Sequence, residues 1–160
     1  MSTTPVPIYL NLRRRILELA PAEAGLQPIP DAPNVWGVLM ETGYDEGIIT
    51  LVCLADGTTS LYFSTGGGRL GNGQHPAVAY AAKALVAAGE PCVEGMTGTT
   101  DFPLPAAGNT RFIVLTYHGH FTGEASEAEL ASGWHPLSRL YDGAQQVINE
   151  VRLLEADQPG

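Results

Sequence analysis

The sequence contains few charged residues, and among them cations are scarce. Charged residues make up 16% of the 160 residues, against about 25% in an average soluble domain, so much of the surface must consist of uncharged groups. Lysine occurs once, at Lys83, and 8 Lys and Arg stand against 17 Asp and Glu, which gives a net charge of -9. A chain this acidic repels polyanions, which disfavours nucleic acid as a partner.

Long hydrophobic runs and cysteines are also scarce. The uncharged stretch at residues 112–123 has about a dozen residues, fewer than the roughly 20 apolar residues of a membrane span, so we expect no membrane partner. The arginines at residues 13–15 follow the first apolar residues instead of preceding them, so we expect no signal peptide and a cytoplasmic location. In that compartment Cys53 and Cys92 are predicted to be free thiols.

Turn-forming residues, by contrast, are abundant, with 19 Gly and 12 Pro. The length fits a single domain, residues 1–160, that is large enough to bury a core without a disulfide or a metal. We expect residues 1–7 and 155–160 to fray at its two ends.

Apolar periodicity predicts three helices and a sheet. Helical spacing of apolar residues occurs at residues 8–19, 76–88 and 137–154. Gly89 stands where a C-cap glycine would end the second helix, and Ser126 with Glu129 has the capping-box spacing of a short helical turn. The strand patterns lie at residues 36–40, 48–54, 60–64 and 112–117.

The order of these elements indicates the α+β class. It runs helix, three-stranded meander, helix, strands, helix, and it predicts a mainly antiparallel sheet of about five strands with three helices. Asp56-Gly57 is a hairpin signal between the second and third strands. This order resembles that of the profilin-like folds, among them the Roadblock-type modules. The resemblance implies a small cytosolic protein that homodimerises and scaffolds or regulates small GTPases.

A glycine-rich loop joins the third strand to the second helix, with glycines at five of residues 66–73. Such a loop before a helix can aim several backbone N–H groups at an anion. The residues predicted to bind a ligand in this way are Gly66, Gly67, Gly68, Arg69 and His75. Gly66, Gly68 and Gly71 also match G-x-G-x-x-G, but the preceding strand belongs to a meander, and Pro76 starts the helix late for a dinucleotide-binding unit. The alternative is a turning connector without a ligand.

The sequence Gly-x-His-Pro occurs twice, at residues 73–76 before the second helix and at residues 133–136 before the last one. Proline suits the first turn of a helix, so His75 and His135 fall at or near the N-caps. If the two helix starts converge, these histidines could form a paired base or a metal site. If they lie apart, each histidine is only a cap.

A third motif places His118 and His120 on either side of a glycine. On a straight strand both side chains would project from one face, as in His-x-His metal sites. No carboxylate or cysteine at metal spacing accompanies them, so the pair is a weak metal candidate, and haem ligation by one of the histidines is an equally weak one. Structural or surface histidines are the favoured interpretation.

Three of the eight basic residues stand together at Arg13, Arg14 and Arg15. One interpretation is that they pair with Glu18, Glu23 or acidic groups elsewhere in the domain. The other is that they dock an acidic partner.

No catalytic motif stands out, and the sequence identifies no cofactor. We therefore expect a non-enzymatic interaction or regulatory module that forms a homodimer. The strands at residues 48–54 and 112–117 are apolar on both faces, and a second copy could complete the cover that three helices leave unfinished. The alternative is a protein that binds a small anionic ligand through the loop at residues 66–75, or a metal or haem through its histidines.

Overall fold

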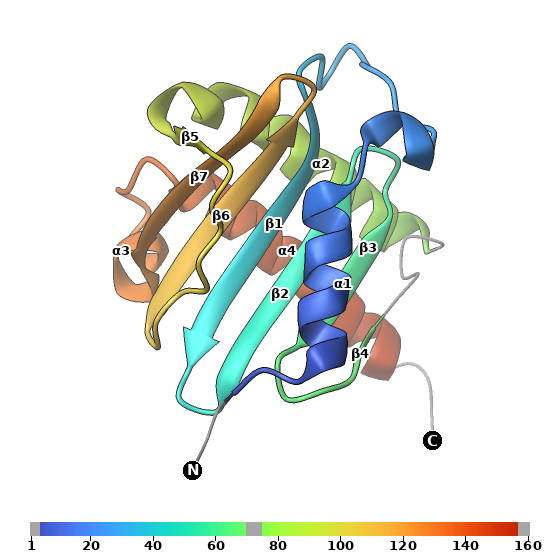
Figure 1. The fold of residues 1–160 in the computed structure, drawn as a ribbon. Coiled ribbons are helices and arrows are strands. Elements are labelled where there is room, and N and C mark those ends of the chain that lie inside the picture. Colours follow the sequence, from blue (N-terminus) through green and yellow to red (C-terminus); the bar gives the residue numbers. More distant parts are fainter. Residues whose placement is uncertain (1–3, 70–74, 157–160) are drawn as a thin grey trace.

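The computed structural model describes residues 4–69 and 75–156 (Figure 1). These residues form one antiparallel sheet of seven strands in the order β4-β3-β2-β1-β6-β7-β5. The strands are β1 (Val35–Tyr44), β2 (Gly47–Leu54), β3 (Thr59–Phe63), β4 (Gly68–Arg69), β5 (Thr97–Thr99), β6 (Asn109–Thr116) and β7 (Gly119–Ser126). The helices are α1 (Pro7–Glu18), α2 (Pro76–Cys92), α3 (Glu127–Ala131) and α4 (Ser138–Ala156), with short 3-10 helices η1 (Pro21–Ala24) and η3 (Val93–Gly95). The α+β class expected from the sequence is confirmed.

The expected numbers of about five strands and three helices are too low. The additional strands include β4 and β5, which have two and three residues and are too short to leave a periodic pattern in the sequence. The fourth helix, α3, has five residues and starts at the predicted capping box. In that box the Glu129 N–H donates to Ser126 Oγ at 3.2 Å, and the Ser126 N–H donates to Glu129 Oε1 at 3.3 Å.

Helix α2 is longer than predicted because Gly89 does not end it. Gly89 is buried, and a Cβ atom there would lie 3.4–3.5 Å from side chains of Val35, Val38 and Val114. The glycine therefore allows the helix to approach the sheet closely, and the helix continues to Cys92.

One face of the sheet is covered by α2 and α4, which lie behind it in Figure 1. Their apolar sides pack on alternate residues of the central strands, as period-2 patterning requires. This cluster includes Val38, Met40, Leu51, Cys53, Val78, Leu85, Phe112, Val114, Leu140 and Val147.

The opposite face is covered by α1, which crosses the sheet in front of β2 and β3 in Figure 1, and by Phe102 of the segment that follows β5. The buried residues of this second cluster are Trp36, Leu39, Val52, Leu54, Ile113 and Leu115. Trp36 is fully buried, and its indole N–H donates to the Thr116 carbonyl at 3.0 Å.

The two strands predicted to need cover on both faces have it at their centres, whereas Ile48, Ile49 and Tyr117 are only partly buried. Residues 51–53 and 112–115 are at most 2% exposed. Because this cover comes from the same chain, the central parts of these strands are shielded from water without a second copy. The energetic reason given above for a homodimer does not hold there. The homodimer itself stays a prediction.

The fraying of residues 1–7 and 155–160 stays a prediction. Helix α1 includes Pro7, and α4 includes Glu155 and Ala156, whereas residues 1–3 and 157–160 lie outside the described residues. Within the described part of the chain, no helix combines the length and the hydrophobicity that crossing a membrane would require.

Candidate functional site

The glycine-rich loop begins as the tight turn of the β3–β4 hairpin. The Gly66 N–H donates to the Phe63 carbonyl at 2.9 Å, and the Phe63 N–H donates to the Gly67 carbonyl at 3.2 Å. Gly66 and Gly67 have φ angles of 111° and 82°, in the region that favours glycine. At Gly68 a Cβ atom would lie 2.2 Å from the Leu61 carbonyl oxygen. These three glycines thus have structural reasons to be glycine.

Ligand binding by this loop stays a prediction. Arg69 ends β4, whereas residues 70–74, with Gly71, lie outside the described part of the chain. His75 is the N-cap of α2, and its side chain makes no capping hydrogen bond.

The structure does not bring His75 and His135 together. His135 lines a cleft of about 600 Å³ with Pro91 and Cys92, at the C-terminal end of α2, whereas His75 is at the N-terminal end of the same helix. A helix of 17 residues is about 25 Å long. His135 instead organises its own turn, because its Nδ1 accepts from the Leu137 N–H at 3.0 Å. The alternative of a paired base or metal site is therefore wrong for these two histidines.

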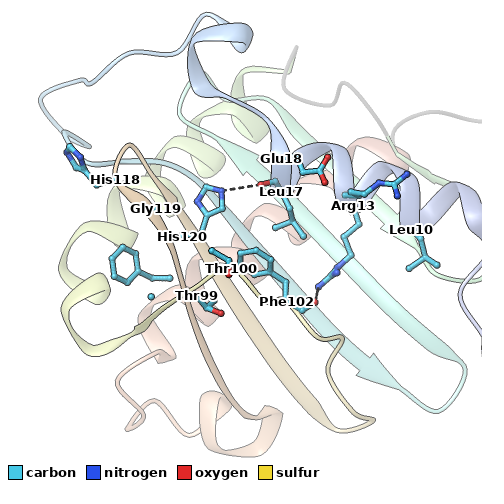
Figure 2. Close-up of a pocket in the computed structure, with 13 residues that line it drawn as sticks. Leu10, Arg13, Leu17, Glu18, Thr99, Thr100, Phe102, His118, Gly119 and His120 are labelled. Atoms are coloured by element: carbon cyan, nitrogen blue, oxygen red, sulfur yellow. Dashed lines mark hydrogen bonds between the residues drawn. The ribbon is translucent and has the colours of Figure 1, made fainter.

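His118 and His120 do not form the predicted pair on one strand face, because only His120 is on a strand. His118 is exposed in the turn between β6 and β7, and Figure 2 shows it at the tip of the hairpin, away from His120. The His120 ring lies 6.0 Å from the ring centroids of both Trp36 and Phe102, and its Nε2 is 3.3 Å from the Leu17 carbonyl oxygen. Nowhere in residues 4–69 and 75–156 do three or more His, Cys, Asp or Glu side chains gather in a way that could hold a metal ion.

His120 instead belongs to an open cleft of about 890 Å³ between α1 and the strands β5 and β7, here called the α1 groove (Figure 2). One wall is a stripe of α1 and the other is the chain from Gly98 to Phe102, with the start of β7 at one end. The lining residues are Leu10, Arg13, Arg14, Leu17, Glu18, Gly98, Thr99, Thr100, Phe102, His118, Gly119, His120 and Phe121.

Arg13 forms a buried ion pair with Glu41 of β1 and also links the two walls of the groove. Arg13 Nε donates to Glu41 Oε2 at 2.6 Å, and Arg13 Nη2 donates to Glu41 Oε1 at 2.8 Å. The same Nη2 donates to the Phe102 carbonyl at 2.7 Å, which links α1 to the opposite wall. Glu41 is fully buried on β1, and the Arg13 side chain is 10% exposed.

Two hydroxyl groups complete this network under α1. Thr50 Oγ1 donates to Glu41 Oε2 at 2.9 Å, and the Tyr9 hydroxyl lies 2.7 Å from Thr50 Oγ1. Burial and the charge of Glu41 together raise the pKa of Tyr9 to about 12. Burial alone would lower the pKa of Arg13, but the hydrogen bonds and the charge of Glu41 outweigh it and raise that pKa. Arg13 is therefore held in its charged form.

The charged groups at the groove balance each other. Glu41 compensates Arg13, and the exposed residues Arg14 and Glu18 lie on the same wall with opposite signs. The Arg14 guanidinium is also held by Asn11, whose Oδ1 accepts from Nη2 at 2.7 Å. The groove thus offers apolar side chains and hydroxyl groups with little net charge.

The groove combines residues that the sequence did not place together. Arg13 and Glu41 are 28 positions apart, and Phe102 is 89 positions from Arg13. The available signal was the run of arginines at residues 13–15, for which pairing with acidic groups elsewhere in the domain was one interpretation. Arg13 follows that interpretation, whereas Arg14 and Arg15 are exposed. Glu41, the glutamate that directly follows the apolar pattern of residues 36–40, was the missing second half of the signal.

Comparison with protein families, with curated proteins and with solved structures finds no match to this chain.

Proposed function

We propose that this protein is a non-enzymatic binding module that holds a small, largely apolar molecule in the α1 groove. The observation that carries the proposal is the size and lining of the groove. Its volume of about 890 Å³ lies within the roughly 300–1,000 Å³ that is typical of small-molecule sites.

The lining has the composition of such sites. Leu10 and Leu17 are two helical turns apart on the same face of α1, and Phe102 and Phe121 line the groove from the other side. Thr100 adds a hydroxyl group that can orient a ligand, whereas Thr99 Oγ1 is committed to Asp101, to whose carbonyl it donates at 3.0 Å and from whose N–H it accepts at 2.9 Å. Leu10 is 42% exposed, so a molecule in the groove would remove apolar surface from water that folding leaves exposed.

A binding role is favoured over catalysis by the placement of the titratable groups. His120 is engaged with the Leu17 carbonyl, and Arg13 is engaged with Glu41. Within the described residues, neither group makes a hydrogen bond to a hydroxyl or a thiol, the pairing that would activate a nucleophile.

The test uses the neutral fluorescent probe N-phenyl-1-naphthylamine, whose emission rises when it leaves water. We expect saturable binding to the intact protein with one site per chain. Leu10→Gln should weaken this binding, whereas Ile8→Gln should not, because Ile8 is 58% exposed on the same helix and does not line the groove. Absence of saturable binding, or equal binding by both variants, would show that the groove is not the site.

A homodimer is a second proposal, favoured by the exposure of Trp134. This side chain is 92% exposed, and the turn that carries it is fixed by bonds from Trp134 N–H to Ser132 Oγ and from Ser138 Oγ to the Leu130 carbonyl. A large aromatic side chain on a preorganised turn is typical of an interface anchor. Light scattering from low to high micromolar concentration tests it. Dimerisation that Trp134→Ala abolishes supports the proposal, with Tyr80→Ala as the control, since Tyr80 is 79% exposed on α2. A monomer at every concentration refutes it.

A further inference from the structure

Arg13 retains one uncommitted donor at the groove. Its Nε and Nη2 are bonded to Glu41 and to the Phe102 carbonyl. Its third nitrogen, Nη1, makes no hydrogen bond to any described residue, and it is not among the polar atoms that are closed off from solvent. Because Arg13 lines the α1 groove and its side chain is 10% exposed, we infer that this donor faces the groove. A guanidinium cannot be deprotonated in a protein, so Nη1 is a permanent donor.

The charge around Arg13 decides what kind of acceptor fits. Glu41 already neutralises the guanidinium from the buried side, and Glu18 is on the same wall of the groove as Arg14. A ligand carboxylate would add an uncompensated negative charge beside the buried Glu41 in a partly desolvated cleft, within a protein of net charge -9. A neutral carbonyl oxygen can accept from Nη1 without that cost.

The apolar part of the ligand has a defined place as well. Leu10 and Leu17 are seven residues apart on α1, so the apolar wall that they begin and end is about 10 Å long. Arg13 lies between them on the same wall, with Phe102 opposite. An acceptor at Nη1 therefore leaves room for an aromatic ring or a short alkyl chain along the leucines.

We propose that the ligand of the α1 groove is a neutral amphipathic molecule, an amide or another carbonyl compound with an aromatic or alkyl body, whose oxygen accepts a hydrogen bond from Arg13 Nη1. This inference rests on the proposed function of the groove and names the chemical class that it selects. This class differs from the anionic ligand that the sequence predicted for the loop at residues 66–75, because Arg13 in the α1 groove is already paired with the Glu41 carboxylate.

The experiment compares two probes of the same size. 4-Phenylbutanamide and 4-phenylbutanoate differ in a neutral amide against a carboxylate, and each is used to displace N-phenyl-1-naphthylamine from the full chain. We expect the amide to compete about tenfold more strongly, because the carboxylate would add an uncompensated charge beside Glu41. Arg13→Lys, which lacks the Nη1 donor, should weaken competition by the amide about tenfold, the order of magnitude of one hydrogen bond to a charged group, and Arg15→Lys on the exposed side of α1 should leave it unchanged.

The outcomes separate the inference from the proposed function. If the naphthylamine binds but the carboxylate competes as well as the amide, or neither competes, the neutral-carbonyl inference is wrong and the groove remains a binding site. If the amide competes as strongly for Arg13→Lys as for the wild type, Nη1 is not the donor and the inference is also wrong. If the naphthylamine does not bind at all, the proposed function fails and the inference fails with it.

A second variant covers the case in which Arg13→Lys does not fold. Replacing the whole pair, Arg13→Met with Glu41→Leu, removes both buried charges together, which proteins often tolerate. This double variant should bind the naphthylamine probe but bind the amide about tenfold more weakly than the wild type does. Unchanged affinity for the amide would overturn the role of Arg13.

Discussion

The Arg13-Glu41 pair should be the most sensitive side-chain interaction between α1 and the sheet. Glu41 is fully buried, and Arg13 supplies both hydrogen bonds to its carboxylate from a guanidinium, the bidentate geometry that makes such pairs strong. Replacing Arg13 by Met leaves that carboxylate buried without a counter-charge. Removing one partner of a buried pair costs about 3–5 kcal/mol of unfolding free energy.

The cost translates into a measurable shift of the melting temperature. For a chain of this size, each kcal/mol changes Tm by about 2–4 °C, so Arg13→Met should lower Tm by about 6–20 °C. Circular dichroism melting and urea unfolding provide the two assays. The matched control is Arg15→Met on the same helix, because Arg15 is exposed, and it should change the unfolding free energy by no more than about 0.5 kcal/mol.

The double variant Arg13→Met with Glu41→Leu distinguishes a lost counter-charge from lost packing. If the buried carboxylate causes the damage, the double variant should be more stable than Arg13→Met alone. An Arg13→Met protein within about 1 kcal/mol of the wild type would refute the reasoning, because it would mean that Glu41 finds water or another partner at no cost.

Three further predictions concern pH, thiol reactivity and the close approach of Ala106 to β1. The folded-state pKa of Tyr9, about 12, lies above the ordinary tyrosine value of 10.0, so the contribution of Tyr9 to stability is complete below pH 10 and is lost as pH rises toward 12. The urea midpoint of the wild type should fall over that pH range, and that of Tyr9→Phe should fall less steeply. Burial raises the pKa of Cys53 to about 12, and Cys92 is only partly buried, so a thiol reagent at neutral pH should modify Cys92 in the native protein and Cys53 only after unfolding; native labelling of Cys53 would contradict the packing of β2. A Cβ atom at Gly43 would lie 2.3 Å from the Ala106 carbonyl oxygen, so Gly43→Ala should destabilise the protein by about 2 kcal/mol or more and speed hydrogen exchange in the segment after β5. The control is Gly95→Ala, because a Cβ atom there would have no atom within 4 Å. Equal stability of the two variants would contradict the close approach.

Local patterns in the sequence predicted the elements whose periodicity is long enough to read. The last helix was expected at residues 137–154 and is observed at Ser138–Ala156. The Asp56-Gly57 signal is confirmed by the turn between β2 and β3, where Gly57 has a φ of 93° and the Thr58 N–H donates to Asp56 Oδ1 at 2.9 Å. In these cases the interactions that decide the structure lie within a few residues of each other.

The same patterns failed where a distant part of the chain decides the structure. Gly89 is a residue type typical of helix ends, but here it allows α2 to pack closely against three valines of β1 and β6. β7 contains Gly119 and Gly123 and no apolar run, and it is a strand because β6 pairs with it along its whole length. Local sequence contains no information on such pairings, since strand propensity depends on neighbours across the sheet.

The candidate site was the least predictable part of the molecule. Sequence singled out glycine and histidine motifs, because these have recognisable spacing, whereas the α1 groove is built from ordinary residues on α1, β5 and β7. His118 and His120 do line it, but for a reason unrelated to their spacing, namely that the β6–β7 hairpin ends there. The position of a cleft depends on how elements pack, which no short motif encodes.

The two covers of the sheet differ in how firmly they are held. Helices α2 and α4 pack against each other as well as against the strands, with Gly143 close to Leu85, whereas α1 shares its face with the segment that carries Phe102 and has no second α-helix of the described chain packed beside it (Figure 1). A lone amphipathic helix can detach at a lower free energy than the whole domain needs to unfold, so amide exchange should identify α1 as the first helix to open. Because α1 is itself one wall of the cleft, a bound molecule would be released at each such opening, and its residence time would be set by how often the helix lifts.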